Sequence, residues 1–373
     1  MIQRGIATFT LDEGRCPRWL FERMVKLGRE IIRALVAELG PERFIERIGD
    51  PVWFQSLGTV LAFDWNASGL TTILTAALKE AIRGEEQDLG IFICGGKGKT
   101  SRKTPDEINQ WSERLSLPPE KSQALVYNSR ISAKVDSALL QDGYQIYHHA
   151  FFFTKSGAWT VVQQGMNIET ETARRYHWYS ERLEDMVCEP HTGIVSPVKH
   201  ARVLDLTARN SHQARTVSTD LVSQSHGVLF KDLQLLSRHR TPISATARFS
   251  TSEGPLTLLH LKGTEFYYHP MVRENFSESR YLQKILTKLC DEKPKSYETL
   301  LATPGVGPKT IRALALVAEI IYGARVSYED PARYSFAHGG KDATPYPVDR
   351  PTYDRTIEIM KRVGARAKRK LSP

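Results

Sequence analysis

The chain has few cysteines and no long hydrophobic run, and each absence excludes a class of protein. Its four cysteines lie far apart along 373 residues and form no Cys-x-x-Cys pair: Cys16, Cys94, Cys188 and Cys290. A disulfide framework and a zinc ribbon are therefore not indicated, and a reducing cytoplasm fits best. No stretch approaches the roughly 18 apolar residues of a membrane span, and the first ten residues lack a signal-peptide core. We expect a cytoplasmic protein without a membrane anchor.

A nucleotide-binding P-loop is also missing, although one stretch superficially resembles it. A buried strand is expected at residues 90–94, and Gly95-Gly96-Lys97-Gly98-Lys99 follows directly. The P-loop motif needs a glycine five residues before Gly98, and Ile93 stands there, so an NTPase is not expected. The stretch predicts a basic loop in which Lys97 and Lys99 contact phosphates, and the alternative is an ordinary solvated loop.

Positive charge, by contrast, is in excess. Lys and Arg number 51 against 42 Asp and Glu, which gives a net charge of +9 and an isoelectric point near 9.3. This balance favours a polyanionic partner, although a merely basic protein would look the same. Hydrophobic residues make up 41% of the chain, enough for the cores of two or three domains. Oligomerisation is possible, but nothing in the sequence indicates it.

The stretch from Leu300 to Ala318 is the most informative motif. An apolar helix, the turn Pro304-Gly305-Val306-Gly307-Pro308 and an alanine-rich helix are expected in succession. Glycine adopts left-handed backbone angles freely, Val306 can fill the gap between the helices, and proline is tolerated in a first helical turn. The N–H groups of Gly305, Gly307 and Lys309 could then hold a phosphate at a helix N-terminus.

This stretch resembles the helix-hairpin-helix motif of DNA-repair and replication proteins. The resemblance implies a sequence-independent grip on a DNA backbone, with contacts from Gly305, Val306, Gly307, Lys309 and Thr310. The alternative is an ordinary helical hairpin that happens to turn on Gly-Val-Gly.

The remaining pattern predicts an α+β protein: a mixed α/β N-terminal body with an antiparallel hairpin, followed by a helical helix-hairpin-helix module. We expect a catalytic body at residues 1–275 and the DNA-binding module, with its basic tail, at residues 276–373. A long helix is expected at about residues 18–39, whereas the polar region 207–240 has no clear pattern. In the hairpin, pairing Phe153 with Ala158 would place His148 opposite Gln163.

Several phrases spread over nearly the whole chain carry a second resemblance: Pro17-Arg18-Trp19-Leu20, Asp64-Trp65, Gly95-Gly96-Lys97-Gly98, Ala133-Lys134-Val135-Asp136-Ser137, Gln141-Asp142-Gly143-Tyr144, Gln163-Gln164-Gly165-Met166-Asn167, Arg174-Arg175-Tyr176-His177-Trp178 and Glu189-Pro190-His191. On these phrases the chain is similar to the family catalogued as domain of unknown function 763. That resemblance implies no settled reaction, so function has to be argued from sites.

The leading hypothesis is a metal-dependent nuclease that acts on DNA phosphodiesters in repair or recombination and associates with the nucleoid. Such chemistry needs an activated nucleophile, stabilised phosphoryl charge and a proton for the leaving group. Asp136, Asp142 and Glu189 are candidate ligands for Mg²⁺ or Mn²⁺. The other candidates crowd into the same region: Lys134 and Arg174 for phosphoryl charge, Arg175 for DNA contact, and His148, His149, His177, His191, Gln163 and Gln164 for catalysis.

Two alternatives stay open, and a further resemblance does not add a third. A non-enzymatic, architectural DNA-binding protein would use the histidine-rich body only for packing or partner contacts. A helix-hairpin-helix glycosylase or lyase would use Lys309 as the attacking group with Asp330 in support. The segment from Tyr147 to Asn167 is also weakly similar to the active hairpin of phospholipase D-type nucleases, but Ala150 stands where that family requires lysine.

Overall fold

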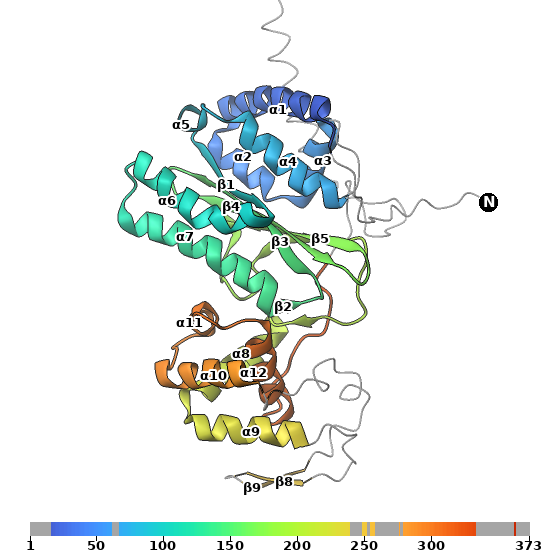
Figure 1. Cartoon of the computed structure of the whole chain (residues 1–373), viewed down its shortest axis with the longest axis vertical. Coiled ribbons are helices and arrows are strands. Elements are labelled where there is room, and N and C mark those ends of the chain that lie inside the picture. The colour runs from blue at the N-terminus through green and yellow to red at the C-terminus, as the bar shows by residue number, and fades with distance from the viewer. Residues whose placement is uncertain are drawn as a thin grey trace, which may run out of the picture. The chain divides into compact units, whose positions relative to one another are not determined.

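The computed structural model describes residues 16–61, 67–238, 248–251, 254–257, 276, 279–332 and 362, and the statements below concern these residues (Figure 1). The chain divides into two compact units: unit 1 is Met1–Val203 with Glu329–Pro373, and unit 2 is Leu204–Tyr328. The expected basic tail lies outside the described residues except for Arg362.

Unit 1 contains a sheet and most of the helices. In chain order its elements are α1 (Arg18–Leu39), α2 (Pro41–Ile48), α3 (Pro51–Val60), α4 (Ala67–Ala81), α5 (Glu86–Leu89), β1 (Ile91–Lys97), the 3₁₀ turn η1 (Gly98–Lys103), α6 (Thr104–Arg114), α7 (Pro119–Lys134), the π-helical segment η2 (Val135–Leu139), β2 (Leu140–Gln141), β3 (Gln145–Thr154), β4 (Trp159–Asn167), β5 (Thr172–Tyr179), the 3₁₀ turn η3 (Ser180–Arg182) and β6 (His191–Val195).

Five antiparallel strands form this sheet, in the order β1-β3-β4-β5-β6. Phe153 lies opposite Trp159, so the expected pairing of Phe153 with Ala158 is wrong by one residue. The reason is that the Thr154 N–H binds the Ala158 carbonyl across the turn, so Ala158 lies opposite Thr154 and not opposite Phe153. The pairing breaks between Ile146 and His148, where Tyr147 forms a β-bulge.

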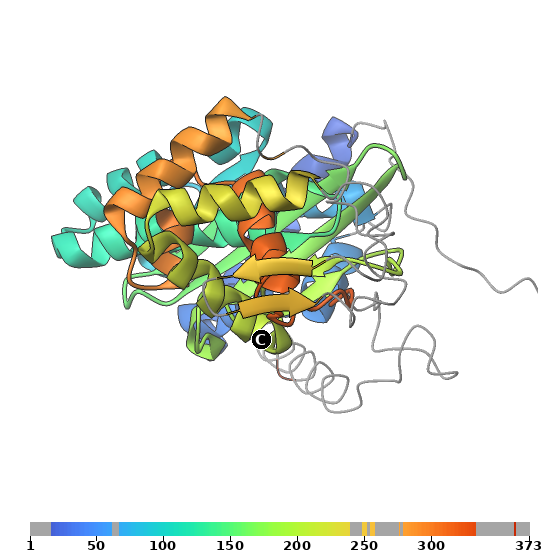
Figure 2. The ribbon, with the colours of Figure 1, turned by 90° about the horizontal axis from the view of Figure 1, so that it is seen from below.

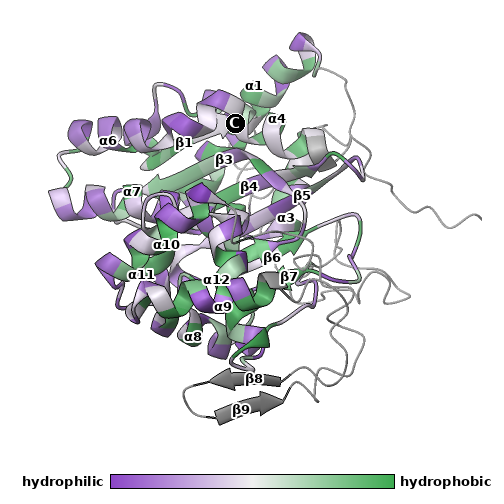
Figure 3. Cartoon of the chain, turned by 60° about the horizontal axis from the view of Figure 1, so that its bottom comes forward, coloured by the Kyte–Doolittle hydropathy of each residue, from purple (hydrophilic) through white to green (hydrophobic). Residues whose placement is uncertain are grey.

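Each face of the sheet is covered by a different group of helices, as Figure 1 shows. On the first face, Phe152, Val162 and Tyr179 join one apolar core with α1, α2, α3 and α4. On the second face, α6 places Trp111 against Phe92, with ring centroids 5.0 Å apart, and α7 also packs there. Figure 3 shows β3 and β4 as mainly hydrophobic, whereas α6 and α7 carry many hydrophilic residues. The core of unit 1 therefore lies on both faces of the sheet.

Unit 2 is mainly helical. Its elements are β7 (Leu204–Asp205), the 3₁₀ turn η4 (Arg209–Ser211), α8 (His212–Ser223), α9 (His226–Arg238), β8 (Arg248–Thr251), β9 (Gly254–Thr257), α10 (Arg280–Glu292), α11 (Tyr297–Ala302) and α12 (Pro308–Ile320). The helix α8 packs against α10, α11 and α12, while β8 and β9 pair antiparallel (Figure 2). An isolated bridge from Asp205 to Ser327 joins the two ends of the unit.

The α+β class is confirmed, and the long helix expected at residues 18–39 is α1. The compact units do not coincide with the boundary expected between residues 275 and 276, because α8 and α9 belong with α10–α12 and residues from Glu329 onward return to unit 1. A separately folding module that starts at residue 276 stays a prediction. Among the helices of the described ranges, none has the length and apolar character to cross a membrane.

Candidate functional site

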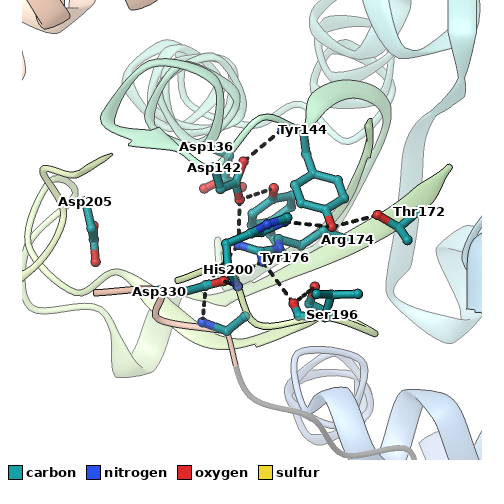
Figure 4. Close-up of polar contacts among 12 residues, drawn as sticks. Asp136, Asp142, Tyr144, Thr172, Arg174, Tyr176, Ser196, His200, Asp205 and Asp330 are labelled. Atoms are coloured by element: carbon teal, nitrogen blue, oxygen red, sulfur yellow. Dashed lines mark hydrogen bonds and ion pairs between the residues drawn. The ribbon is translucent and has the colours of Figure 1, made fainter. Parts of the chain in front are cut away.

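Two aspartates hold a buried arginine on the second face of the sheet (Figure 4). Arg174 donates to Asp142 at 2.9 Å and to both carboxylate oxygens of Asp330, at 3.0 and 2.8 Å. Asp142 also accepts from the Tyr176 hydroxyl at 2.7 Å, and the guanidinium lies 4.7 Å from the Tyr144 ring centroid. All three charged side chains are fully buried or nearly so. The group is a buried ion network of one guanidinium and two carboxylates.

This network changes the roles expected of its members. Arg174 is not exposed to a DNA backbone, so its expected phosphate contact is not supported. Burial raises the pKa of Asp142, against the opposing effects of Arg174 and Tyr176, and its oxygens are already occupied. Asp330 likewise accepts from the backbone N–H groups of His200 and Ala332. It is committed to this network, which removes the basis for pairing it with Lys309 in a glycosylase.

A second polar cluster surrounds Asp136, also on the second face. The carboxylate accepts from Gln163 Nε2 at 2.5 Å, from Trp178 Nε1 at 3.0 Å and from His191 Nε2 at 2.5 Å. Gln163 Oε1 bonds His149 Nδ1 at 3.0 Å, and His149 Nε2 bonds Ser129 Oγ at 2.9 Å. Side chains from β3, β4, β5 and β6 thus converge on or behind the one carboxylate in η2. We call Asp136, Gln163, Trp178, His149 and His191 the Asp136 cluster.

The local backbone explains how Asp136 reaches this position. It lies in η2, where α7 widens into π-helical turns before the chain enters β2. Such π-helical turns are found frequently at functional sites. Two residues before His191, Glu189 has a positive φ of 47°, an uncommon conformation for a non-glycine residue.

The other predicted histidines lie on the first face, away from the Asp136 cluster. His148 Nε2 bonds Thr75 Oγ1 at 3.1 Å, and His177 Nδ1 bonds the Ile48 carbonyl at 3.0 Å. Burial lowers the pKa of His148 to about 3 and that of His177 well below its ordinary value. Both are neutral members of the helix–sheet interface, so the expected pocket of His148 with Gln163 is wrong because adjacent strand residues point to opposite faces.

Arg175 shares that first face and is buried as well. The sheet places Lys97, His148, Gln164 and Arg175 in one row across four strands. The Arg175 guanidinium bonds Gln55 Oε1 at 3.2 Å and Thr71 Oγ1 at 3.5 Å. Burial lowers its pKa to about 9. An expected DNA contact by Arg175 is therefore not supported, whereas Gln164, which donates to the Tyr147 hydroxyl at 2.5 Å, lines the bulge.

The predicted metal ligands do not meet. Asp136 lies in its cluster, Asp142 bonds Arg174, and Glu189 is exposed on the segment before β6. Within the described ranges, no group of three or more His, Cys, Asp or Glu side chains has the arrangement needed to hold a metal ion. The trio of Asp136, Asp142 and Glu189 is therefore not a preformed Mg²⁺ or Mn²⁺ site. Lys134 ends α7 at a partly exposed position.

The predicted DNA contacts that remain exposed lie in two turns. Lys97 and Lys99 are exposed beside η1, and Lys97 Nζ lies 5.9 Å from the Tyr147 ring centroid. In unit 2, Thr303–Gly307 connects α11 with α12, Val306 is buried as expected, and Lys309 is partly exposed. Thr310 is 2% exposed, so only its backbone can face a ligand there.

Several members of these networks escaped the sequence analysis: Ser129, Tyr144, Tyr147, Tyr176, Trp178 and Thr75. A usable signal existed for two of them, because the alternation of strand side chains groups Arg174, Tyr176 and Trp178 on one face and Arg175 and His177 on the other. No local pattern marks Ser129 or Thr75.

Comparison with known proteins adds one result. Neither a search of curated proteins nor a search of solved structures found a match. The family model described as "Protein of unknown function (DUF763)" matches residues 5–348 and so spans both units. The resemblance drawn from the sequence phrases is thereby confirmed, and the chain belongs to the DUF763 family.

Proposed function

We propose that the protein binds DNA through the phosphate backbone, at the turn between α11 and α12. The first turn of α12 has no side-chain cap, so its N–H groups are available to an anion. Within the described residues Lys309 makes no ion pair, and its position in the first turn adds a positive charge to that helix end.

Gly307 is the observation that carries this proposal. Its φ of −147° is extended backbone that any residue adopts, and a Cβ built on it would meet no described atom within 4 Å. The fold itself therefore gives no reason for glycine at this position. A ligand that approaches the backbone closely does give one, because a side chain would occupy its place.

Gly305 is needed for the turn itself. Its φ is +96°, and an added Cβ would overlap Ile285 Cδ1 of α10. The same helix also supports the turn from outside: the Tyr281 hydroxyl donates to the Gly305 carbonyl at 3.0 Å, and Lys288 Nζ donates to the Pro304 carbonyl at 3.4 Å. Replacing Gly305 should therefore affect mainly folding, whereas replacing Gly307 should affect mainly binding.

The test compares Gly305→Ala with Gly307→Ala in the full chain. We expect Gly307→Ala to keep the melting temperature and lose at least tenfold in affinity for duplex DNA of any sequence. Lys309→Ala should lower the dependence of log affinity on log salt by about one unit. Gly305→Ala should lower the melting temperature. Unchanged DNA affinity in both Gly307→Ala and Lys309→Ala would reject the proposal.

DNA cleavage is a second candidate function, and one observation favours it. In the Asp136 cluster, a histidine near the surface is paired with a buried carboxylate, an arrangement suited to proton transfer. Any Mg²⁺ or Mn²⁺ would need ligands beyond the expected trio. Binding without cleavage would instead favour the architectural role, and either role agrees with an association with the nucleoid.

A further inference from the structure

The geometry points to His191 as the general base of the candidate cleavage reaction, with Asp136, Gln163 and His149 as positioning residues that fix which ring nitrogen accepts the proton. This inference rests on the second candidate function above and names the atom that would do its chemistry. The inference does not require Asp136, Asp142 and Glu189 to bind one metal ion together.

The hydrogen bonds of the Asp136 cluster have a definite direction. Gln163 donates through Nε2 to Asp136, so its Oε1 must accept from His149, which therefore carries its proton on Nδ1. His149 Nε2 is then an acceptor, and Ser129 Oγ donates to it. Burial lowers the pKa of His149, in agreement with a neutral ring.

The same logic fixes the tautomer of His191. Both oxygens of the Asp136 carboxylate act as acceptors: Oδ2 receives Gln163 and Trp178, and Oδ1 faces His191 Nε2 at 2.5 Å. His191 therefore carries a proton on Nε2, so the neutral ring has its lone pair on Nδ1. Within the part of the chain that the structure describes, Nδ1 has no hydrogen-bond partner.

Packing holds the ring in that orientation. Trp178 meets it edge to face, with centroids 5.0 Å apart, and Tyr176 lies 6.1 Å away. The side chain is 7% exposed while that of Asp136 is fully buried. The pair thus holds one acceptor nitrogen on a rigid, desolvated support, as a general base requires.

The substrate class is a phosphodiester of nucleic acid. A water molecule attacks phosphorus and forms the new P–O bond, while its proton passes to His191 Nδ1. The bond from phosphorus to the departing sugar oxygen breaks, and that oxygen takes a proton from solvent. The Asp136 carboxylate stabilises the imidazolium that forms.

Asp136→Asn tests the tautomer directly, because it keeps the shape of the side chain. Gln163 and Trp178 both donate to Oδ2, so the amide oxygen must stay there and the amide NH₂ must face His191 Nε2. His191 then accepts at Nε2 and carries its proton on Nδ1, where it no longer acts as a base. His191→Gln removes the base but keeps an NH₂ donor for Asp136, and His212→Ala changes an exposed histidine as the matched control.

The experiment measures cleavage of labelled single-stranded, duplex and flapped DNA by the full chain, with Mg²⁺, Mn²⁺ or EDTA, together with DNA affinity and NMR of the histidine ring nitrogens. We expect Asp136→Asn and His191→Gln each to lose at least about a hundredfold in cleavage rate with unchanged DNA affinity. NMR should show the Nε2–H tautomer of His191 in the wild type and Nδ1–H in Asp136→Asn.

Three results would overturn the inference: an Nδ1–H tautomer in the wild type, cleavage by His191→Gln at the wild-type rate, or no cleavage by the wild type under any condition. In the last case retained DNA affinity would leave the binding proposal standing, so the two failures are distinguishable.

Discussion

At the scale of single residues, burial decides what a titratable group can do. His148, His149 and His177 all look like catalytic candidates in the sequence, since histidine titrates near neutral pH. In the fold, burial is the main cause that lowers the pKa of each, and their hydrogen bonds go to a threonine, a glutamine and a backbone carbonyl. We therefore expect these three histidines to affect how stable the fold is in acid.

We predict that the free energy of unfolding falls as the pH drops below about 6.5, the ordinary value for histidine. Between that pH and about 3, the value reached by His148, the unfolded chain binds protons that the folded chain does not, so acid favours unfolding. Each such histidine contributes up to about 1.4 kcal/mol per pH unit. Urea unfolding at pH 7.5 and 5.5 measures the slope.

The variant His148→Gln should reduce this slope by about one proton, whereas His212→Ala should leave it unchanged because His212 is exposed. An unfolding free energy that stays constant over this pH range would show that the buried rings take up protons as readily as exposed ones.

At the scale of elements, the end of β1 and the start of η1 each contain a glycine with a positive φ, and the two have different surroundings. Gly95 has a φ of +85°, and an added Cβ would overlap the His149 carbonyl and Thr104 Oγ1. Its N–H donates to Glu107, which also pairs with Lys79. Gly98 has a φ of +60°, but no described atom lies within 4 Å of its added Cβ. Of these two glycines, only Gly95 has described atoms where a side chain would lie.

We predict that Gly95→Ala lowers the free energy of unfolding by roughly 2–5 kcal/mol, since left-handed strain and overpacking add. Gly98→Ala should cost only about 1–2 kcal/mol, from the backbone angle alone. Urea midpoints of the two variants provide the comparison. Equal losses would mean that the contacts around Gly95 relax at little cost.

Sequence patterns predicted elements with strong periodicity and missed those without it. The spacing of Leu20, Met24 and Leu27 predicts α1, and β-branched and aromatic residues predict β3 and β4. The helix α8 was not predicted, because polar residues such as Arg215 and Ser218 fill its buried positions. The register between β3 and β4 could not be predicted from the sequence, because it depends on the turn at Thr154. A shift of one residue moves side chains to the other face.

The candidate site was predictable in composition and not in arrangement. Asp136, Gln163, His149 and His191 stood among the expected residues, and the fold brings them together. Asp142 belongs instead to Arg174, a partnership that also involves Asp330, far along the chain. No local pattern encodes a contact between residues so distant in sequence.

At the scale of the whole molecule, unit 2 defines the smallest part that should fold alone. The buried residues Ala214, Leu221 and Val222 of α8 belong to the helix that packs on α10, α11 and α12. We predict that a fragment of residues 204–328 unfolds cooperatively and binds DNA, whereas one of residues 276–328 does not fold because it lacks α8. Thermal unfolding followed by circular dichroism compares them. Cooperative unfolding of the shorter fragment would instead support a boundary at residue 276.

The two carboxylates that bond Arg174 become available at different times during synthesis of the chain. Arg174 meets Asp142 within the first half of the chain, but Asp330 lies 156 residues further on. During synthesis the ribosome releases unit 2 before it releases this second carboxylate. A nascent chain therefore holds the buried guanidinium without Asp330 until residue 330 has been synthesised. Chains truncated before Asp330 lack the two hydrogen bonds that it accepts from Arg174, so we expect cellular proteases to remove them.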